Sequence, residues 1–191
     1  SAALRAAHLG AKVLVLEKAD IIGGTTAMSG GCIWVPNHHH QVRLGVQDSM
    51  DDAMNYIRAV SPDGWHNAEE PLWQAFVDEA PKMLRFVEDR TPITFNPNHE
   101  PDPYAELNGG KAFGRNVSAG PLRAGHAGPW KDKIRRPAVN VELSYEEVVD
   151  TFFFAQAKRW AVKFAPRLLW RRLWDKRTRG NALTIGLLRG C

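Results

Sequence analysis

A short apolar run that ends in an acidic residue constrains the fold of this chain more than any other feature of its sequence. The run is Lys12–Glu17, and an alanine-rich segment that ends at Gly10 precedes it. Alanine favours a helix and glycine commonly ends one, so we expect a helix over Ala2–Gly10. A continuous apolar run of this length is typical of a strand that is covered on both faces of a parallel sheet. The pattern therefore predicts the second half of a βαβ unit in an α/β protein.

A bend rich in glycine and hydroxyl groups begins six residues after Glu17. Glycine lets a backbone approach a pyrophosphate or a flat ring closely, and hydroxyl and N–H groups supply hydrogen-bond donors. In dinucleotide-binding βαβ units, a carboxylate at the end of the strand accepts hydrogen bonds from ribose hydroxyls, and Glu17 has that position. A surface carboxylate beside a flexible connection is the alternative. The candidate binding residues of the bend are Gly23, Gly24, Thr25, Thr26, Ser29, Gly30 and Gly31.

Hydrophobic periodicity predicts two helices after the bend. The first begins near Asp48 or Ser49, either of which can cap it, and ends near Val60. The second spans about Glu69–Asp89 and is interrupted by Pro81. Its buried stripe is expected to consist of Leu72, Phe76, Ala80, Met83 and Val87.

Prolines and glycines interrupt the pattern further along the chain. Pro92–Phe95 predicts a short strand, and residues 96–142 are expected to be irregular. Ser144 and Glu147 have the spacing of a capping box, in which each side chain bonds the other residue's backbone N–H. The remaining helices are expected over 144–165, from Pro166 to about Lys176, and from near Asn181.

Composition and charge narrow the class of protein. No apolar run reaches the roughly 18 residues that a membrane span needs, and no signal-peptide pattern opens the chain. Two cysteines do not suggest a disulfide framework, which predicts a cytoplasmic location. Residues 151–191 hold ten basic residues and one acidic residue, whereas residues 1–150 hold fifteen and twenty. This basic, aromatic-rich tail is typical of a solvated or covered helix face, or of a surface that binds a membrane or nucleic acid.

Three consecutive histidines, His38, His39 and His40, are candidate metal ligands because imidazole is a common zinc ligand. Adjacent imidazoles cannot easily converge on one ion, and no carboxylate or cysteine is suitably spaced. We therefore expect a loop surface and no metal site.

Several motifs together resemble the fumarate reductase/succinate dehydrogenase flavoprotein superfamily of FAD-dependent oxidoreductases. The motifs are Leu14–Lys18, Gly23–Gly31 and Ile33–Asn37. The ending Trp34–Asn37 is similar to the 3-ketosteroid Δ1-dehydrogenase branch, as are Tyr104–Lys111 with Gly114-Arg115 and, near the C-terminus, Arg179–Leu183. The resemblance spans most of the chain and is most specific over residues 14–37.

The resemblance implies an α/β fold in which a Rossmann-like, parallel-sheet FAD-binding domain lacks its first strand and is followed by a mainly helical cap segment. The implied division is a partial FAD-binding domain at 1–47, a helical and loop-rich segment at 48–143, and a basic helical segment at 144–191. The glycine turn of the family, which places N–H groups against the pyrophosphate, would precede Ser1.

The same resemblance implies which residues contact the cofactor. Glu17 would hold the ribose, with Lys18 beside it, and the bend would contact the pyrophosphate and the flavin. Respiratory members attach FAD through a histidine in this region. No histidine lies between Glu17 and Asn37, so FAD is expected to be non-covalent.

One catalytic position can be matched. Steroid Δ1-dehydrogenases carry a tyrosine pair after Pro-Asp, where a tyrosine helps to move the substrate proton. This chain has Pro103 in place of the first tyrosine, followed by Tyr104. Tyr104 is therefore the catalytic candidate, and Pro103 weakens the expectation of steroid specificity.

The resemblance, together with Glu17 and the bend, implies part of an FAD-dependent oxidoreductase that dehydrogenates or reduces a carbon–carbon bond next to a carbonyl, and that is expected to be inactive by itself. The expected substrate is a small molecule, either a steroid or another hydrophobic ketone. A fumarate reductase-like enoate reductase is one alternative, and an inactive truncated remnant or a basic membrane-surface binding module is another. Nucleic acid is not an expected partner, whereas the basic tail leaves peripheral membrane contact open.

Overall fold

The structure, a computed structural model, describes residues 1–137, 141–149 and 157–191. The chain divides into two compact units. The first unit comprises Ser1–Cys32, Val87–Asn96 and Ser118–Cys191, and the second comprises Ile33–Phe86 and Pro97–Val117.

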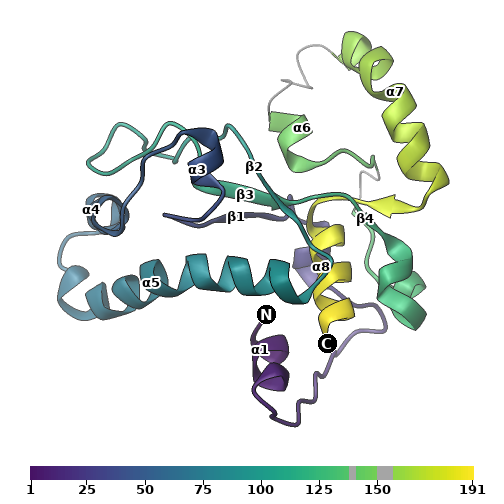
Figure 1. The fold of residues 1–191 in the computed structure, drawn as a ribbon, viewed down its shortest axis with the longest axis horizontal. Helices are drawn as coiled ribbons and strands as arrows, with labels where there is room; N and C mark the ends of the chain where they lie inside the picture. The colour runs from purple at the N-terminus through teal and green to yellow at the C-terminus, as the bar shows by residue number, and fades with distance from the viewer. Residues whose placement is uncertain (138–140, 150–156) are drawn as a thin grey trace. The chain divides into compact units, whose positions relative to one another are not determined.

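Mostly short helices and short strands make up the regular structure of the chain (Figure 1). The helices are α1 (Ala2–His8), α2 (Gly24–Met28), α3 (Gln41–Leu44), α4 (Met50–Val60), α5 (His66–Arg90), the 3-10 helix η1 (Ala124–Lys133), α6 (Tyr145–Val149), α7 (Ala157–Leu173) and α8 (Arg179–Gly190). The strands are β1 (Cys32–Trp34), β2 (Phe95–Pro97), β3 (Asn116–Ala119), β4 (Leu122–Arg123) and β5 (Lys176–Arg177). They form a three-stranded sheet in the order β1-β3-β2 and an antiparallel pair, β4-β5.

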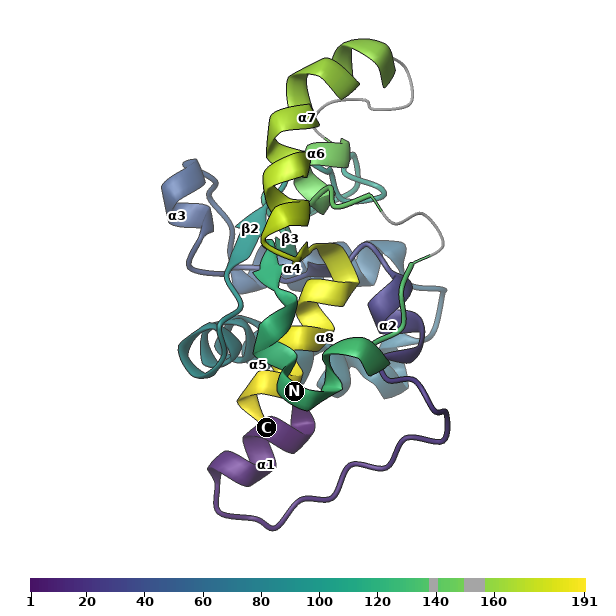
Figure 2. The ribbon, with the colours of Figure 1, turned by 90° about the vertical axis from the view of Figure 1, so that its right-hand side faces the viewer.

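The run at Lys12–Glu17 does not form the buried strand that the sequence predicts. It has no strand pairing, and Leu14 and Leu16 are 81% and 83% exposed. Figure 2 shows the segment after α1 as an extended trace. A strand requires a hydrogen-bonded neighbour and apolar cover, and no described residue supplies a ladder to this run. The parallel pairing nearest to it is an isolated bridge between Ile22 and Ile134.

Helix α8 lies at the centre of the first unit and packs against α2 and η1 (Figure 2). Its first turns are buried, including Gly180 and Ala182. A Cβ on Gly180 would lie 1.8 Å from the carbonyl oxygen of Thr26, so only glycine fits there. The Gly180 N–H donates to the Ser29 carbonyl at 3.1 Å, and Asn181 Nδ2 donates to the Ala27 carbonyl at 3.2 Å. These contacts fix the backbone of the bend on α8.

The C-terminal helices differ from the prediction at Pro166. The helix expected to start there is instead continuous with the preceding residues, because α7 runs through Pro166 to Leu173. A proline removes one backbone hydrogen bond, but ion pairs hold the turns that follow. Arg167 Nη1 and Arg171 Nη1 each lie 2.5 Å from a carboxylate oxygen of Glu147. Residues 150–156, which belong to the helix predicted over 144–165, lie outside the described residues.

Helix α4, in the second unit, and helix α5, whose last residues from Val87 on belong to the first unit, begin and end close to the predicted residues. The Ser49 hydroxyl caps α4 by accepting from the Asp52 N–H at 3.0 Å. The predicted stripe of α5 is wrong at its N-terminal end, where Leu72 and Phe76 are 63% and 44% exposed. Ala80 and Val87 of that stripe are buried as predicted, whereas Val77 and Leu84 are buried in place of Phe76 and Met83. Each of these two positions is displaced by one residue, which corresponds to a turn of about 100° around the helix axis.

A buried arginine joins the loops of the second unit. The side chains of Arg115, Asp48 and Asp102 are 0%, 0% and 1% exposed. Arg115 donates through Nη2 and Nε to the two oxygens of Asp48, at 2.6 and 2.9 Å, and through Nη1 to Asp102 at 2.9 Å. Burial alone would raise the pKa of Asp48, but hydrogen bonds from Arg115 and the Asn37 N–H outweigh it and lower the pKa.

The histidine triplet is not the loop surface that the sequence predicts. His38 and His40 are 2% and 9% exposed. His38 Nε2 lies 2.8 Å from the Gly114 carbonyl, and its Nδ1 accepts from the His40 N–H at 3.2 Å. This pairing requires the neutral ring with its proton on Nε2. Burial lowers the pKa of His38 to about 4.

The contact between Gly180 and the bend predicts that Gly180→Ala destabilises the chain strongly. The new methyl group would collide with backbone, so we expect a loss of about 3 kcal/mol or more in the free energy of unfolding. Gly125→Ala is the matched control, because no atom lies within 4 Å of the added Cβ. Urea unfolding followed by circular dichroism measures both variants. Equal midpoints for the two would contradict this packing.

The buried network predicts that Arg115→Met destabilises the second unit by about 3–5 kcal/mol, because two buried carboxylates lose their cation. Tryptophan fluorescence during urea unfolding measures the loss, and Trp34, whose Nε1 donates to Asp102 at 2.7 Å, is one of the seven tryptophans that contribute to it. Arg58→Met is the control, because Arg58 pairs with Glu70 on the surface. The network would have no structural importance if both substitutions moved the fluorescence midpoint equally.

Candidate functional site

The glycines at the start of the bend have backbone conformations that other residues rarely adopt. Gly23 and Gly24 have φ angles of 105° and 48°. A Cβ on Gly23 would lie 2.7 Å from the Cβ of Ala27, so this glycine allows the turn to pack. A Cβ on Gly24 would meet nothing within 4 Å. Gly24 therefore presents bare backbone to open space, as close approach by a ligand requires.

The two glycines that end the bend serve packing. A Cβ on Gly30 would lie 2.6 Å from the ring of Tyr145. A Cβ on Gly31 would lie 2.5 Å from the carbonyl carbon of Arg179. The structure thus places the Gly23–Gly31 motif and the start of the Arg179–Leu183 motif against each other within one unit.

The hydroxyl-bearing residues of the bend are exposed. Thr25, Thr26 and Ser29 all lie on the surface. Ser29 Oγ donates to the Thr26 carbonyl at 2.8 Å and accepts from the Gly31 N–H at 3.1 Å, so it shapes the turn. The side chains of Thr25 and Thr26 have no recorded hydrogen bond among the described residues, which leaves their hydroxyls accessible to a ligand.

Glu17 and Lys18 lie in the exposed segment between α1 and α2. The Glu17 carboxylate accepts a hydrogen bond from the Ala19 N–H at 3.0 Å. This contact is local and does not link Glu17 to the bend. Their roles as ribose contacts therefore stay predictions.

The structure adds Arg135, which the sequence analysis did not identify, to the surroundings of the bend. Its N–H donates to the Ile22 carbonyl at 2.9 Å, and its Nη1 lies 3.7 Å from Met28 Sδ. No motif marks this residue, because it reaches the bend through a bridge between Ile22 and Ile134, which lie more than a hundred residues apart in the sequence.

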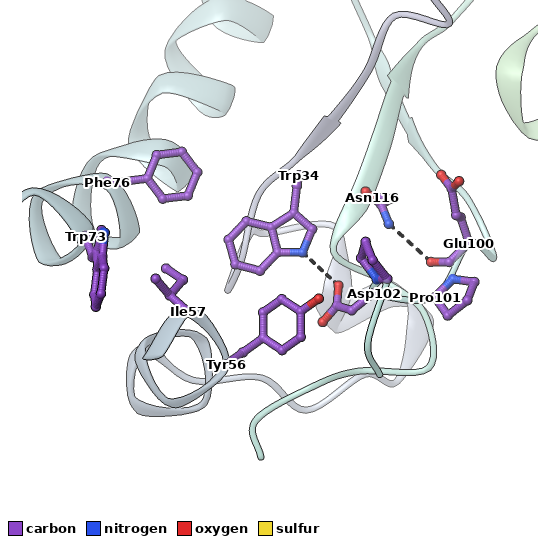
Figure 3. Close-up of a pocket in the computed structure, with 10 residues that line it drawn as sticks. Trp34, Tyr56, Ile57, Trp73, Phe76, Glu100, Pro101, Asp102 and Asn116 are labelled. Carbon is purple, nitrogen blue, oxygen red and sulfur yellow. Dashed lines mark hydrogen bonds between the residues drawn. The ribbon is translucent and has the colours of Figure 1, made fainter. Parts of the chain in front are cut away.

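The second unit contains a cavity of about 810 Å³, and four of its ten lining residues are aromatic (Figure 3). The rings of Trp34 and Phe76 are stacked with centroids 5.9 Å apart and planes 11° apart. Tyr56 stacks on Trp34 at the same centroid distance with planes 30° apart. Asp102 lies at the polar end of the cavity, where it accepts the hydrogen bond from Trp34 Nε1 (Figure 3).

Tyr104, the catalytic candidate, does not line this cavity, and it is 56% exposed. Its loop is nevertheless well held. The Tyr104 N–H donates to Tyr56 Oη at 3.4 Å, and Asp102 accepts from the Lys111 N–H at 2.9 Å. A Cβ on Gly109 would lie 2.1 Å from the Asp52 carbonyl oxygen, so the far side of the loop packs on α4. The phenol therefore projects from a fixed backbone.

Tyr56, which the sequence analysis did not identify, lines the cavity and contacts this loop through its hydroxyl oxygen. Burial raises the pKa of Tyr56, so its phenol is neutral at ordinary pH. The one sequence signal for Tyr56 is its position on the buried face of α4, together with Ala53 and Met54.

Comparison with known proteins gives consistent matches. The family described as FAD binding domain matches residues 1–189. The 3-oxosteroid 1-dehydrogenase of Mycolicibacterium smegmatis is 39% identical over 145 residues, which cover 75% of this chain and 25% of that protein. The 4-oxocyclohexanecarboxylate 2-dehydrogenase of Sinomonas cyclohexanicum is 41% identical over 118 residues, which cover 61% of this chain and 20% of that protein.

A solved structure resembles the chain over nearly its whole length. It is the 3-ketosteroid delta1-dehydrogenase of Sterolibacterium denitrificans in complex with 1,4-androstadiene-3,17-dione, with a TM-score of 0.81 and 29% identity. The match covers 99% of this chain and 36% of that one, so the chain spans about a third of the length of this enzyme.

The family match over almost all residues, together with these relatives, shows that the chain belongs to the FAD binding domain family of FAD-dependent oxidoreductases.

Proposed function

We propose that the chain is part of an FAD-dependent oxidoreductase that dehydrogenates the carbon–carbon bond next to the carbonyl of a hydrophobic cyclic ketone. The observation that carries the proposal is the likeness, over 99% of the chain, to an enzyme crystallised with a cyclic dione. The names of both curated relatives also describe oxo-substituted ring compounds. A steroid is one member of this substrate class.

The bend fits a dinucleotide cofactor in its backbone and its chemistry. Gly24 offers unshielded backbone, and Thr25 and Thr26 offer exposed hydroxyl donors. We assign these three residues to the pyrophosphate and flavin side of FAD. Gly23 and the turn at Ser29–Gly31 are assigned to the same side. Glu17 and Lys18 are assigned to its ribose. FAD, when bound, supplies the acceptor of the hydride that leaves the substrate.

Tyr104 is assigned to proton transfer. A phenol that removes a proton from the carbon next to a ketone must reach the substrate and keep a fixed orientation. Tyr104 is exposed, and its backbone is held through Tyr56 Oη and Asp102. In this proposal, residues 1–47 supply the cofactor contacts and residues 48–143 supply the loop that carries Tyr104. Residues 144–191 supply a basic surface.

A chimera tests the proposed reaction. Residues 1–191 replace the matching segment of the Sterolibacterium denitrificans enzyme, and reduction of an artificial acceptor is measured with cyclic 3-ketones. We expect activity, and Tyr104→Phe should lower kcat by about 100-fold or more with FAD content unchanged in the visible spectrum. A yellow chimera that reduces enoates but oxidises no ketone would contradict the proposed direction. Full activity in the tyrosine variant would remove Tyr104 from the mechanism.

A second candidate function, contact with an anionic membrane surface, is favoured by the exposed side of α7. Leu169 and Leu173 are 60% and 74% exposed, and Trp170 and Trp174 are about half exposed. Lys176 Nζ lies 4.2 Å above the ring of Trp170. Exposed apolar and aromatic side chains beside cations are typical of helices that lie in a membrane interface. No described helix has the length and apolar character to cross a bilayer.

Flotation with vesicles that contain phosphatidylserine tests this contact. We expect binding that falls with salt, and a decrease of about tenfold or more in Leu169→Gln/Leu173→Gln, because each leucine loses apolar burial. Val42→Gln is the control, since Val42 is 83% exposed in the other unit. Equal binding by all three proteins would show that α7 is not the contact surface.

A further inference from the structure

We infer that Arg135 is a further binding residue of the cofactor site and that its guanidinium takes the diphosphate of FAD. The inference rests on the proposed assignment of the bend to FAD. It concerns a residue that lies more than a hundred positions from the bend in the sequence and belongs to none of the motifs described above.

The backbone places Arg135 beside the start of the bend. Ile22 and Ile134 form a parallel bridge. The Ile22 N–H donates to the Lys133 carbonyl at 2.7 Å, and the Arg135 N–H donates to the Ile22 carbonyl at 2.9 Å. Gly23 is the next residue along the chain, so the two backbones are in register where the turn begins.

A shared partner on α8 holds Arg135 and the bend together. Asn181 Nδ2 donates to the Arg135 carbonyl at 2.6 Å and to the Ala27 carbonyl at 3.2 Å. Asn181 is only 5% exposed, so water does not compete strongly for these bonds. One side-chain amide therefore fixes both segments, and the position of Arg135 follows from the same packing as that of the bend.

The guanidinium of Arg135 lacks an anionic partner among the described residues. Its Nε is buried and has no hydrogen-bond acceptor. The contact recorded for its side chain is the one from Nη1 to Met28 Sδ at 3.7 Å, and a thioether is a weak acceptor. Arg171 in the same unit shows the contrast, since Glu147 accepts from both of its terminal nitrogens. A buried donor without an acceptor is unfavourable, which indicates that a ligand supplies the missing anion.

The chemistry of the bend identifies the anion. Gly23–Gly31 contains N–H and hydroxyl donors but no positively charged side chain. A diphosphate carries negative charge that such neutral donors do not balance. Guanidinium binds phosphate oxygens with two parallel hydrogen bonds and stays charged at all ordinary pH values. Arg135 therefore supplies the charge that the bend lacks.

Titration of FAD and riboflavin with the FAD-free form of the chimera described above, followed by fluorescence anisotropy, tests the inference. Riboflavin has the flavin ring but no phosphate. We expect Arg135→Gln to weaken FAD binding by about tenfold to 100-fold, the range for one charge-assisted pair, and to leave riboflavin binding unchanged. Arg135→Lys should bind FAD with intermediate affinity. The control is Arg136→Gln, which changes the neighbouring exposed arginine and should match the parent.

The outcomes separate the two proposals. A folded parent chimera that binds no FAD would overturn the assignment of the bend and this inference with it. FAD binding that is equal in the parent and in Arg135→Gln would overturn the inference alone. Equal losses for FAD and riboflavin would show that Arg135 only positions the bend. If Arg135→Gln does not fold, Arg135→Lys provides the test. The ratio of its FAD affinity to its riboflavin affinity is compared with the same ratio in the parent. Equal ratios would exclude a role for the guanidinium group.

Discussion

The first unit depends on a backbone contact that a side chain would prevent. Gly180, at the start of α8, lies so close to the Thr26 carbonyl that a Cβ would be 1.8 Å from the oxygen, and Gly31 meets Arg179 in the same way. This contact brings together a glycine bend and a helix start that are about 150 residues apart in the sequence. It also leaves Gly24 as the glycine whose backbone stays uncovered. Glycines that serve packing and a glycine with open space around it are therefore distinct, although the sequence shows them as one motif.

Buried ion pairs hold the loops of the second unit together, whereas close backbone packing does so in the first unit. Arg115 bonds two buried carboxylates, and one of them, Asp102, also accepts from Trp34. Removing charges from water is expensive, so such a cluster is retained only when nearly all its hydrogen bonds are made. This cluster fixes the loop that carries Tyr104, because Asp102 belongs to that loop and bonds both Arg115 and the Lys111 N–H. The candidate catalytic side chain is thus exposed on a rigid support, as proton transfer to a positioned substrate requires.

The sequence predicted features that depend on local chemistry and failed where the outcome depends on distant neighbours. The Ser49 cap is local, and it is confirmed. Burial of Lys12–Glu17 depends on partner strands, which the described structure does not provide. The capping box at Ser144 is half formed. The Glu147 carboxylate accepts from the Ser144 N–H, whereas the Ser144 hydroxyl has no hydrogen-bond partner among the described residues. Arg135 could not be predicted at all, because its importance arises from an isolated bridge between segments with no shared motif.

Hydrogen exchange with and without FAD tests the central claim most directly, because it reports on each backbone segment separately. If the bend carries the cofactor, FAD slows the exchange of N–H groups over Gly23–Gly31 and leaves α3 (Gln41–Leu44), in the other unit, unchanged. Slower exchange elsewhere with no change over the bend, under conditions where FAD is bound, would contradict the account. The cofactor would then bind this chain at a different place.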